Sequence, residues 1–100
     1  MAYVTTDFVR AVTGLTEAEV DDERLEQLIN MAEAIVDFET GRCWKPGDEG
    51  FKLAQLATAK LAGWLAYRSL VGAGNKARSH HQEAVELLGR LTRRGTLLRG

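Results

Sequence analysis

Apolar residues recur at three- and four-residue steps along most of the chain, and this spacing predicts helices. The clearest run lies within residues 21–41, where one stripe collects Leu25, Leu28, Ile29, Ala32, Ile35 and Val36. Asp21 or Asp22 can cap the start of this helix, and Gly41 stands where a left-handed C-cap is expected. Phe38 falls off the stripe, so we expect it either to widen the buried face or to contact another chain.

Two further helices are predicted on either side of this one. A short helix follows Thr6, which can cap it, and stops at Gly14. Another begins near Asp48 and ends where Gly72 and Gly74 break the pattern. Its apolar band consists of Leu53, Leu56, Ala57, Leu61, Trp64 and Leu65. Because small residues keep its other faces apolar too, we expect this helix at the centre of a bundle.

The last helix is predicted over residues 79–94, with Ser79 as its cap. A flexible C-terminal tail, residues 95–100, is expected to follow it. Strand-like alternation and internal repeats are absent from the sequence. The pattern therefore predicts an all-α fold, a small bundle of three to four helices with short connections, forming a single domain over residues 1–94.

Charge divides the chain into two unlike halves. Residues 1–50 carry four basic and twelve acidic side chains, whereas residues 51–100 carry nine basic and two acidic ones. The halves could neutralise each other within one subunit, acidic and basic faces could meet between copies, or the basic half could meet nucleic acid. If copies meet, the candidate acids are those at the start of the long helix: Asp21, Asp22 and Glu23.

The candidate basic surface lies near the C-terminus. Arg90, Arg93 and Arg94 share one helical face, which could contact phosphates. Aromatic residues are not interleaved with them, so base stacking would lack a platform. Cations at the end of a helix also complement its dipole.

Catalytic chemistry is not indicated. The chain has neither a nucleotide-binding glycine loop nor a serine–histidine–acid grouping. His80 and His81 are adjacent, so they point about 100° apart on a helix, which favours a solvated helix start over a metal site. Cys43 is expected to be a small, half-buried filler. We expect no enzyme and no cofactor, and apolar runs fall short of the roughly 18 residues of a membrane span.

One ordered set of residues carries a resemblance to a known family. An acidic connector and a leucine-rich helix are followed by an aromatic residue, Thr-Gly-Arg and a second aromatic residue: Phe38, Thr40, Gly41, Arg42 and Trp44. Together with the order of helices over about residues 4 to 72, this resembles the head–tail connector (adaptor, or head-completion) proteins of tailed bacteriophages and related viruses. Members of that family often have a longer, hairpin-like insertion after the tryptophan, where this chain has the short "KPGDEG".

The resemblance implies a structural virion protein without catalysis or cofactor. Such subunits are made in the host cytoplasm and form a ring, commonly of about twelve copies, below the portal at the capsid vertex. The ring extends the channel for genomic DNA and offers a platform for the stopper or tail protein. The alternative is a small helical DNA-binding or DNA-packaging-associated protein, and a toxin–antitoxin or regulatory bundle is a third, weaker one.

Two segments are then expected to make contacts. Trp44 either anchors the loop by folding back over the ends of both long helices or touches a ring neighbour or the portal. The tail is either a frayed end or a docking segment for the portal, in which leucines enter a groove and arginines face acidic side chains or channel DNA. The residues concerned are Leu97, Leu98, Arg93, Arg94 and Arg99.

Overall fold

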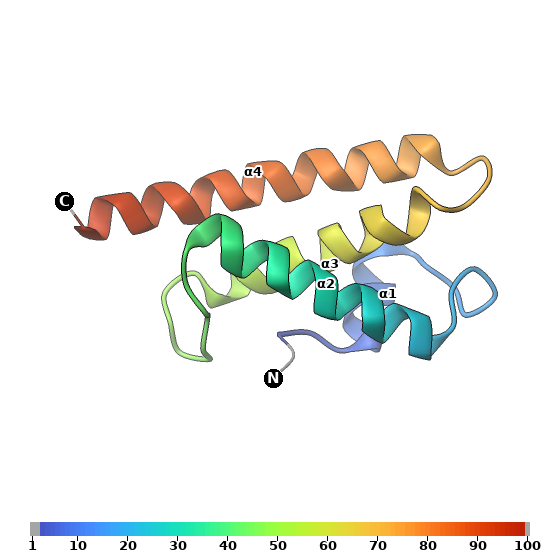
Figure 1. Ribbon diagram of the computed structural model, residues 1–100, viewed down its shortest axis with the longest axis horizontal. Helices are drawn as coiled ribbons and strands as arrows, with labels where there is room; N and C mark the ends of the chain where they lie inside the picture. Colours follow the sequence, from blue (N-terminus) through green and yellow to red (C-terminus); the bar gives the residue numbers. More distant parts are fainter. Residues whose placement is uncertain (1–2, 100) are drawn as a thin grey trace.

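The computed structural model describes residues 3–99, and the side chains of residues 3–92. The chain folds into four helices: α1 (Thr6–Thr13), α2 (Asp22–Thr40), α3 (Phe51–Tyr67) and α4 (Gly74–Arg99). No strand forms within the described residues. The predicted small all-α bundle is confirmed. It is elongated, with α4 along one side of α3, and α1 and α2 along the other (Figure 1).

α3 is the central helix, as its apolar pattern predicts, and it packs against the other three. Most of its residues are buried: Ala54, Ala57, Thr58, Ala59, Leu61, Ala62, Gly63, Leu65, Ala66 and Tyr67. Small side chains let three helices approach α3 from different sides. The helix begins at Phe51 rather than near Asp48, because Gly50 adopts a left-handed φ of 93° that interrupts the helical backbone.

The stripe predicted for α2 is confirmed. Leu25, Leu28, Ile29, Ala32 and Val36 are buried, and Ile35 is half-buried. Asp21 is the N-cap, since its carboxylate accepts a hydrogen bond from the Arg24 N–H at 2.8 Å. Gly41 closes the helix in the left-handed conformation, with φ 73°. The side chain of Phe38 is 84% exposed, so it does not widen the buried face.

The start of α1 differs from the prediction by one residue. Thr5, not Thr6, caps this helix, because the Thr5 hydroxyl accepts a hydrogen bond from the Phe8 N–H at 3.1 Å. This register turns Val9, which is fully buried, toward the core. Gly14 ends the helix with φ 78°, as predicted.

The start of α4 was also predicted wrongly. α4 begins at Gly74, five residues before Ser79, so Gly74 starts this helix and Gly72, with φ 81°, makes the turn before it. Three residues at seven-residue spacing, Ala77, Ala84 and Leu91, are buried along α4. This contact with α3 supplies the stability that the polar first turn lacks.

The α4 backbone runs to Arg99, past residue 94, where the sequence predicted its end. The side chains of the expected tail lie outside the described residues, so the tail interpretations stay predictions.

Candidate functional site

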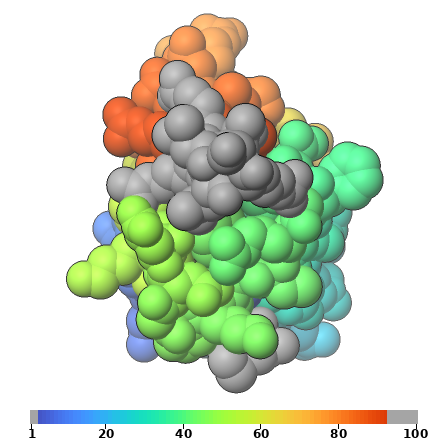
Figure 2. Space-filling model, turned by 90° about the vertical axis from the view of Figure 1, so that its left-hand side faces the viewer, coloured from blue at the N-terminus to red at the C-terminus, as the bar shows by residue number. Residues whose placement is uncertain are grey.

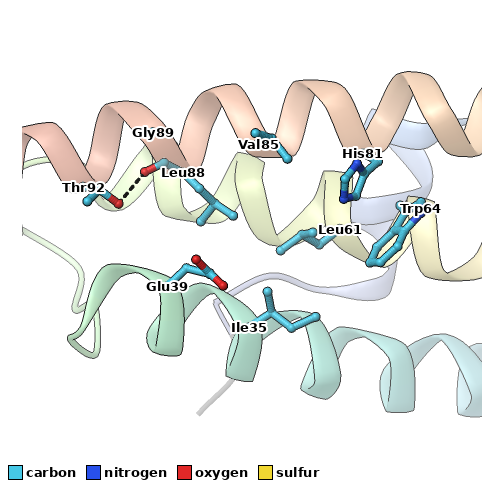
Figure 3. A pocket seen from close by; sticks show the side chains of 9 residues that line it. All are labelled: Ile35, Glu39, Leu61, Trp64, His81, Val85, Leu88, Gly89 and Thr92. Carbon is cyan, nitrogen blue, oxygen red and sulfur yellow. Dashed lines mark hydrogen bonds between the residues drawn. The ribbon is translucent and has the colours of Figure 1, made fainter.

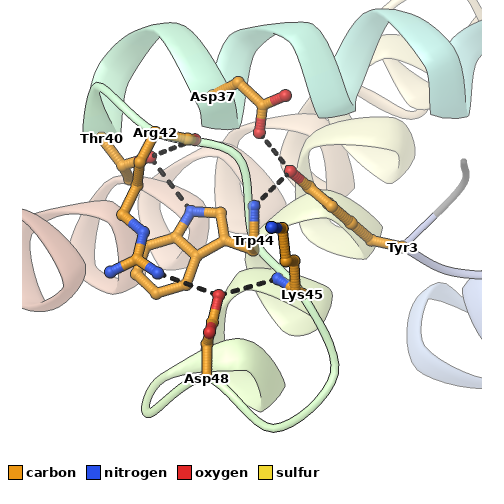
Figure 4. A network of polar contacts seen from close by, with 7 residues as sticks. All are labelled: Tyr3, Asp37, Thr40, Arg42, Trp44, Lys45 and Asp48. Atoms are coloured by element: carbon orange, nitrogen blue, oxygen red, sulfur yellow. Dashed lines mark hydrogen bonds and ion pairs between the residues drawn. The ribbon is translucent and has the colours of Figure 1, made fainter.

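The loop between α2 and α3 is held by Trp44 (Figure 4). The Trp44 side chain is 5% exposed, and its indole Nε1–H donates to Thr40 Oγ1 at 3.1 Å. Gly50, just before α3, lies so close that a Cβ there would be 3.3 Å from the indole ring. Trp44 therefore bridges the end of α2 and the start of α3. The interpretation of Trp44 as a loop anchor is confirmed, and the indole leaves little surface for a neighbour.

The N-terminal segment locks the same loop through Tyr3. The Tyr3 hydroxyl accepts from the Trp44 N–H at 2.9 Å and donates to Asp37. The Tyr3 N–H donates to Glu33 at 2.7 Å, and Gln55 Nε2 donates to the Tyr3 carbonyl at 2.9 Å. Burial and the Asp37 bond raise the pKa of Tyr3 to about 12, and burial also raises the pKa of Glu33. The sequence pattern did not single out Tyr3, because its partners are distant along the chain.

The outer side of the loop is closed by Asp48. Its Oδ2 accepts from the Lys45 N–H at 2.8 Å and from Arg42 Nη2 at 2.9 Å, while the Arg42 guanidinium lies 4.2 Å from the Trp44 ring centroid. In Figure 2 this loop (green) forms the lower part of one end of the molecule, below α4 (orange). Cys43 is exposed rather than half-buried, which corrects its expected role as a filler.

Two of the three acids predicted at a subunit interface have roles inside the subunit. Asp21 caps α2, and Asp22 forms an ion pair with Arg10 at 2.8 Å. Arg10 also donates to the Val20 carbonyl at 2.9 Å, which fixes the connector between α1 and α2. Of these three acids, Glu23 is the one for which the described residues show no hydrogen bond or ion pair, and it is exposed.

The ion pairs of the described side chains do not join the acidic half of the chain to the basic half. Each pair lies within one half: Arg10–Asp22, Arg42–Asp48 and Lys60–Glu83. The Lys60 hydrogen bond holds the pKa of Glu83 below its usual range. These three pairs therefore leave the charge difference between the halves as large as the sequence makes it.

The two histidines pack against aromatic rings of α3. The His81 ring lies 4.6 Å from the Trp64 ring, and the His80 ring lies 5.4 Å from the Tyr67 ring. Because α4 begins at Gly74, both lie beyond its first turn, so their expected place at the helix start is wrong, although His81 is exposed and His80 is half-buried. Within residues 3–92, His, Cys, Asp and Glu form no cluster of three suited to a metal ion. None of the helices that the structure describes is long and apolar enough to span a membrane.

An apolar groove of about 650 Å³ runs between α2 and α4, over α3 (Figure 3). Its apolar walls are formed by Ile35, Leu61, Trp64, Val85 and Leu88. Glu39 lines the groove from the end of α2, and Val85 on α4 is 52% exposed. The stripes of α2 and α3 predicted this apolar surface, but not that the two helices would leave it open beside α4.

Next to the groove, α2 displays large apolar side chains to solvent. Met31 is 47% exposed and Phe38 is 84% exposed, and the small residue Ala34 between them is exposed as well. This leaves the second interpretation of Phe38, a contact with another chain, as a prediction.

The C-terminal candidate residues divide into one that the structure describes and several that it does not. Arg90 is exposed on α4. The side chains of Arg93, Arg94, Leu97, Leu98 and Arg99 lie outside the described residues.

The chain was compared with known proteins at the level of families, sequences and folds. No family model, curated protein or solved structure matches it.

Proposed function

We propose that this protein is a head–tail connector (adaptor) subunit of a tailed bacteriophage or related virus. In this proposal, copies form a ring of about twelve below the portal at the capsid vertex. The ring extends the channel for genomic DNA and receives the stopper or tail protein. The proposal starts from the resemblance of the segment between Phe38 and Trp44 to that family.

The geometry of that segment supports the proposal. Thr40 receives the Trp44 indole hydrogen bond, Gly41 reverses the chain, and Arg42 covers the indole while pairing with Asp48. Four of the five matching residues thus help to fix the angle between two long helices, whereas Phe38 faces solvent. A rigid reversal suits a subunit whose work is to hold its neighbours in register rather than to react.

The observation that carries the proposal is the separation of charge between α2 and α4. α2 has six acidic residues and one basic residue, whereas α4 has six basic residues and two acidic ones. The three described ion pairs do not cancel this difference. A head-to-tail arrangement, in which α4 of one copy faces α2 of the next, would neutralise charge on both helices, and such contacts form a ring when the rotation from copy to copy closes.

The structure determines which acids a test should reverse. Asp21 and Asp22 are unsuitable, because their loss would remove a cap and an ion pair. Glu23 and Glu26 are exposed and have no such role within the described residues. We expect Glu23→Lys with Glu26→Lys to prevent ring formation at low salt while the helical content stays unchanged.

The partner experiment uses Arg78 and Arg90, which are exposed on α4. Reversing both to Glu should also prevent rings, and the chain with all four reversals should form them again. Rings counted by electron microscopy on purified portal report the result. If all three variants bind and assemble on the portal like the natural sequence, the charge separation has no role in assembly.

The C-terminal tail provides a second test of the same proposal. Deleting residues 95–100 should weaken binding to the portal if the leucines there dock into it. Equal binding by the shortened chain would move the portal contact elsewhere on the subunit.

The basic surface of α4 favours one second candidate, a DNA-binding or DNA-packaging-associated protein. This reading expects duplex binding that weakens steeply with salt, because each phosphate contact releases counterions. Duplex binding without portal binding would support it over the connector.

A further inference from the structure

A second interaction surface lies on the solvent side of α2, defined here as the Arg24–Met31–Phe38 face. These residues are spaced seven apart, about two turns, so they lie along one side of the helix. Arg24 is exposed, Met31 is 47% exposed and Phe38 is 84% exposed. The exposed Ala34 between them leaves room for another backbone to approach. Single exposed apolar side chains are normal on a monomer, but apolar side chains gathered on one exposed face can mark a protein–protein interaction site.

The face has the pattern of a two-fold contact with itself. Met31 stands midway between Arg24 and Phe38. When two such helices lie antiparallel about Met31, each guanidinium meets the Phe38 ring of the other copy, a cation–π arrangement. Glu39, exposed beside Phe38, then comes within reach of the same guanidinium. A parallel pairing would instead place like charges together at both ends.

We infer that this face binds the same face of a second copy, forming an antiparallel α2–α2 dimer. Each residue then meets a partner of complementary chemistry, as in an isologous interface. The apolar groove adjoins the face through Ile35 and adds Val85 to the surface that the second copy can cover. The inference is independent of the proposed function, because an isologous contact cannot by itself close a ring.

The size of the contact sets the expected strength of the dimer. A helix of 19 residues is about 28 Å long. A seam of that length lies at the low end of specific interfaces, about 1,200 Å² in total. We therefore expect a dimer at high protein concentration that dissociates on dilution.

Sedimentation velocity over a hundredfold range of concentration tests the contact. Phe38→Ser should leave the chain monomeric at concentrations where the natural sequence is dimeric. Val71→Ser is the matched control, because Val71 is an apolar residue at least as exposed as Phe38, in the turn before α4. The inference fails if the natural chain stays monomeric throughout, or if both variants change the dimer equally.

A charge exchange tests the antiparallel direction. Arg24→Glu and Glu39→Arg should each raise the dissociation constant, on the order of fivefold or more, and the double variant should restore it. A double variant as weak as the two singles combined would exclude this pairing.

Cysteine cross-linking locates the two-fold axis. In a Cys43→Ser background, Met31→Cys should form a dimeric disulfide under mild oxidation, because residue 31 meets itself. Phe38→Cys should not, since two such residues would lie about 21 Å apart along the antiparallel helices. Cross-linking at position 38 but not at 31 would overturn the geometry.

The outcome is separable from the proposed function, because portal binding is measured on its own. If Phe38→Ser leaves the solution state monomeric like the natural chain and weakens only portal binding, the face belongs to the portal and the dimer inference is wrong. If portal binding is absent while the dimer forms as described, only the proposed function fails.

Discussion

Phe38 and Trp44 are aromatic residues only six positions apart, yet they have opposite surroundings. Phe38 is 84% exposed on the outer side of α2, whereas Trp44 is 5% exposed beyond the reversal at Gly41. The indole is hydrogen-bonded to Thr40 and covered by Arg42. Both residues lie near the junction of α2 and the loop that follows it, but only Phe38 exposes its ring to solvent. The difference shows that backbone position, rather than residue type, separates the two: Phe38 falls on the solvent side of α2, and the reversal at Gly41 turns Trp44 back against the core.

The largest expected effect comes from removing the anchor. Trp44→Ala should lower the free energy of unfolding by about 3–5 kcal/mol, because it deletes a buried ring between two helix ends. Denaturant unfolding followed by circular dichroism measures the change. A loss below about 1 kcal/mol would show that the loop holds its shape without the indole.

Gly63 in α3 is a buried position at which the absence of a side chain is expected to stabilise the packing of the subunit. Gly→Ala within a helix ordinarily favours the helix by about 1 kcal/mol. In α3, however, a Cβ at Gly63 would lie 2.6 Å from Thr13 Cγ2 of α1. Gly63→Ala should therefore destabilise the protein by about 1–3 kcal/mol.

The control for Gly63→Ala is a second substitution that removes the obstacle. Thr13→Ser deletes the Cγ2 methyl but keeps the hydroxyl that donates to the Val9 carbonyl at 2.7 Å. Combining it with Gly63→Ala should recover most of the lost stability in thermal unfolding. If the double variant shows no recovery, the cost has another origin.

The hydrogen bonds of Tyr3 to the loop can be tested through the pH dependence of stability. Its pKa is about 12 in the folded protein, above the ordinary value of 10.0. The folded state thus retains the hydroxyl proton that the unfolded chain loses first. The stability from this proton is fully present below about pH 10 and is lost as pH rises toward about 12.

Tyr3→Phe removes both hydroxyl hydrogen bonds and should cost about 1–2 kcal/mol at neutral pH. The free energy of unfolding should also fall less between about pH 9 and pH 11.5 in this variant than in the natural chain. Unfolding curves at both pH values provide the measurement, and parallel declines in the two proteins would refute the role of Tyr3.

The smallest expected effect on stability is at Phe38. Phe38→Ala should change the free energy of unfolding by less than about 0.5 kcal/mol, because the ring lies in solvent within one subunit. The measurement belongs at a protein concentration low enough to exclude self-association. A large loss of unfolding free energy in the dilute monomer would mean that the Phe38 ring packs within its own chain, as the Trp44 ring does.

Local rules were enough for much of the fold. The burial of α2 followed from the spacing of Leu25, Leu28 and their neighbours, since a helix repeats every 3.6 residues whatever it packs against. The ends of α2 were identifiable as Asp21 or Asp22 and as Gly41, because a carboxylate cap and a left-handed glycine act on adjacent backbone groups; the structure selects Asp21. A short turn after Trp44 was likewise predicted from the short, glycine-rich sequence that follows it.

Tertiary structure decided the rest, and contacts between distant residues are the reason. α4 begins at Gly74 because Ala77 and Ala84 are buried against α3, a stabilisation that no local cap signals. Tyr3 holds the loop through hydrogen bonds to Asp37 and Trp44, which lie more than 30 positions away along the chain. The groove beside Phe38 exists only because α2 and α4 lie apart over α3. The hydrophobic periodicity of a helix predicts which of its faces is buried, but not its distance from another helix.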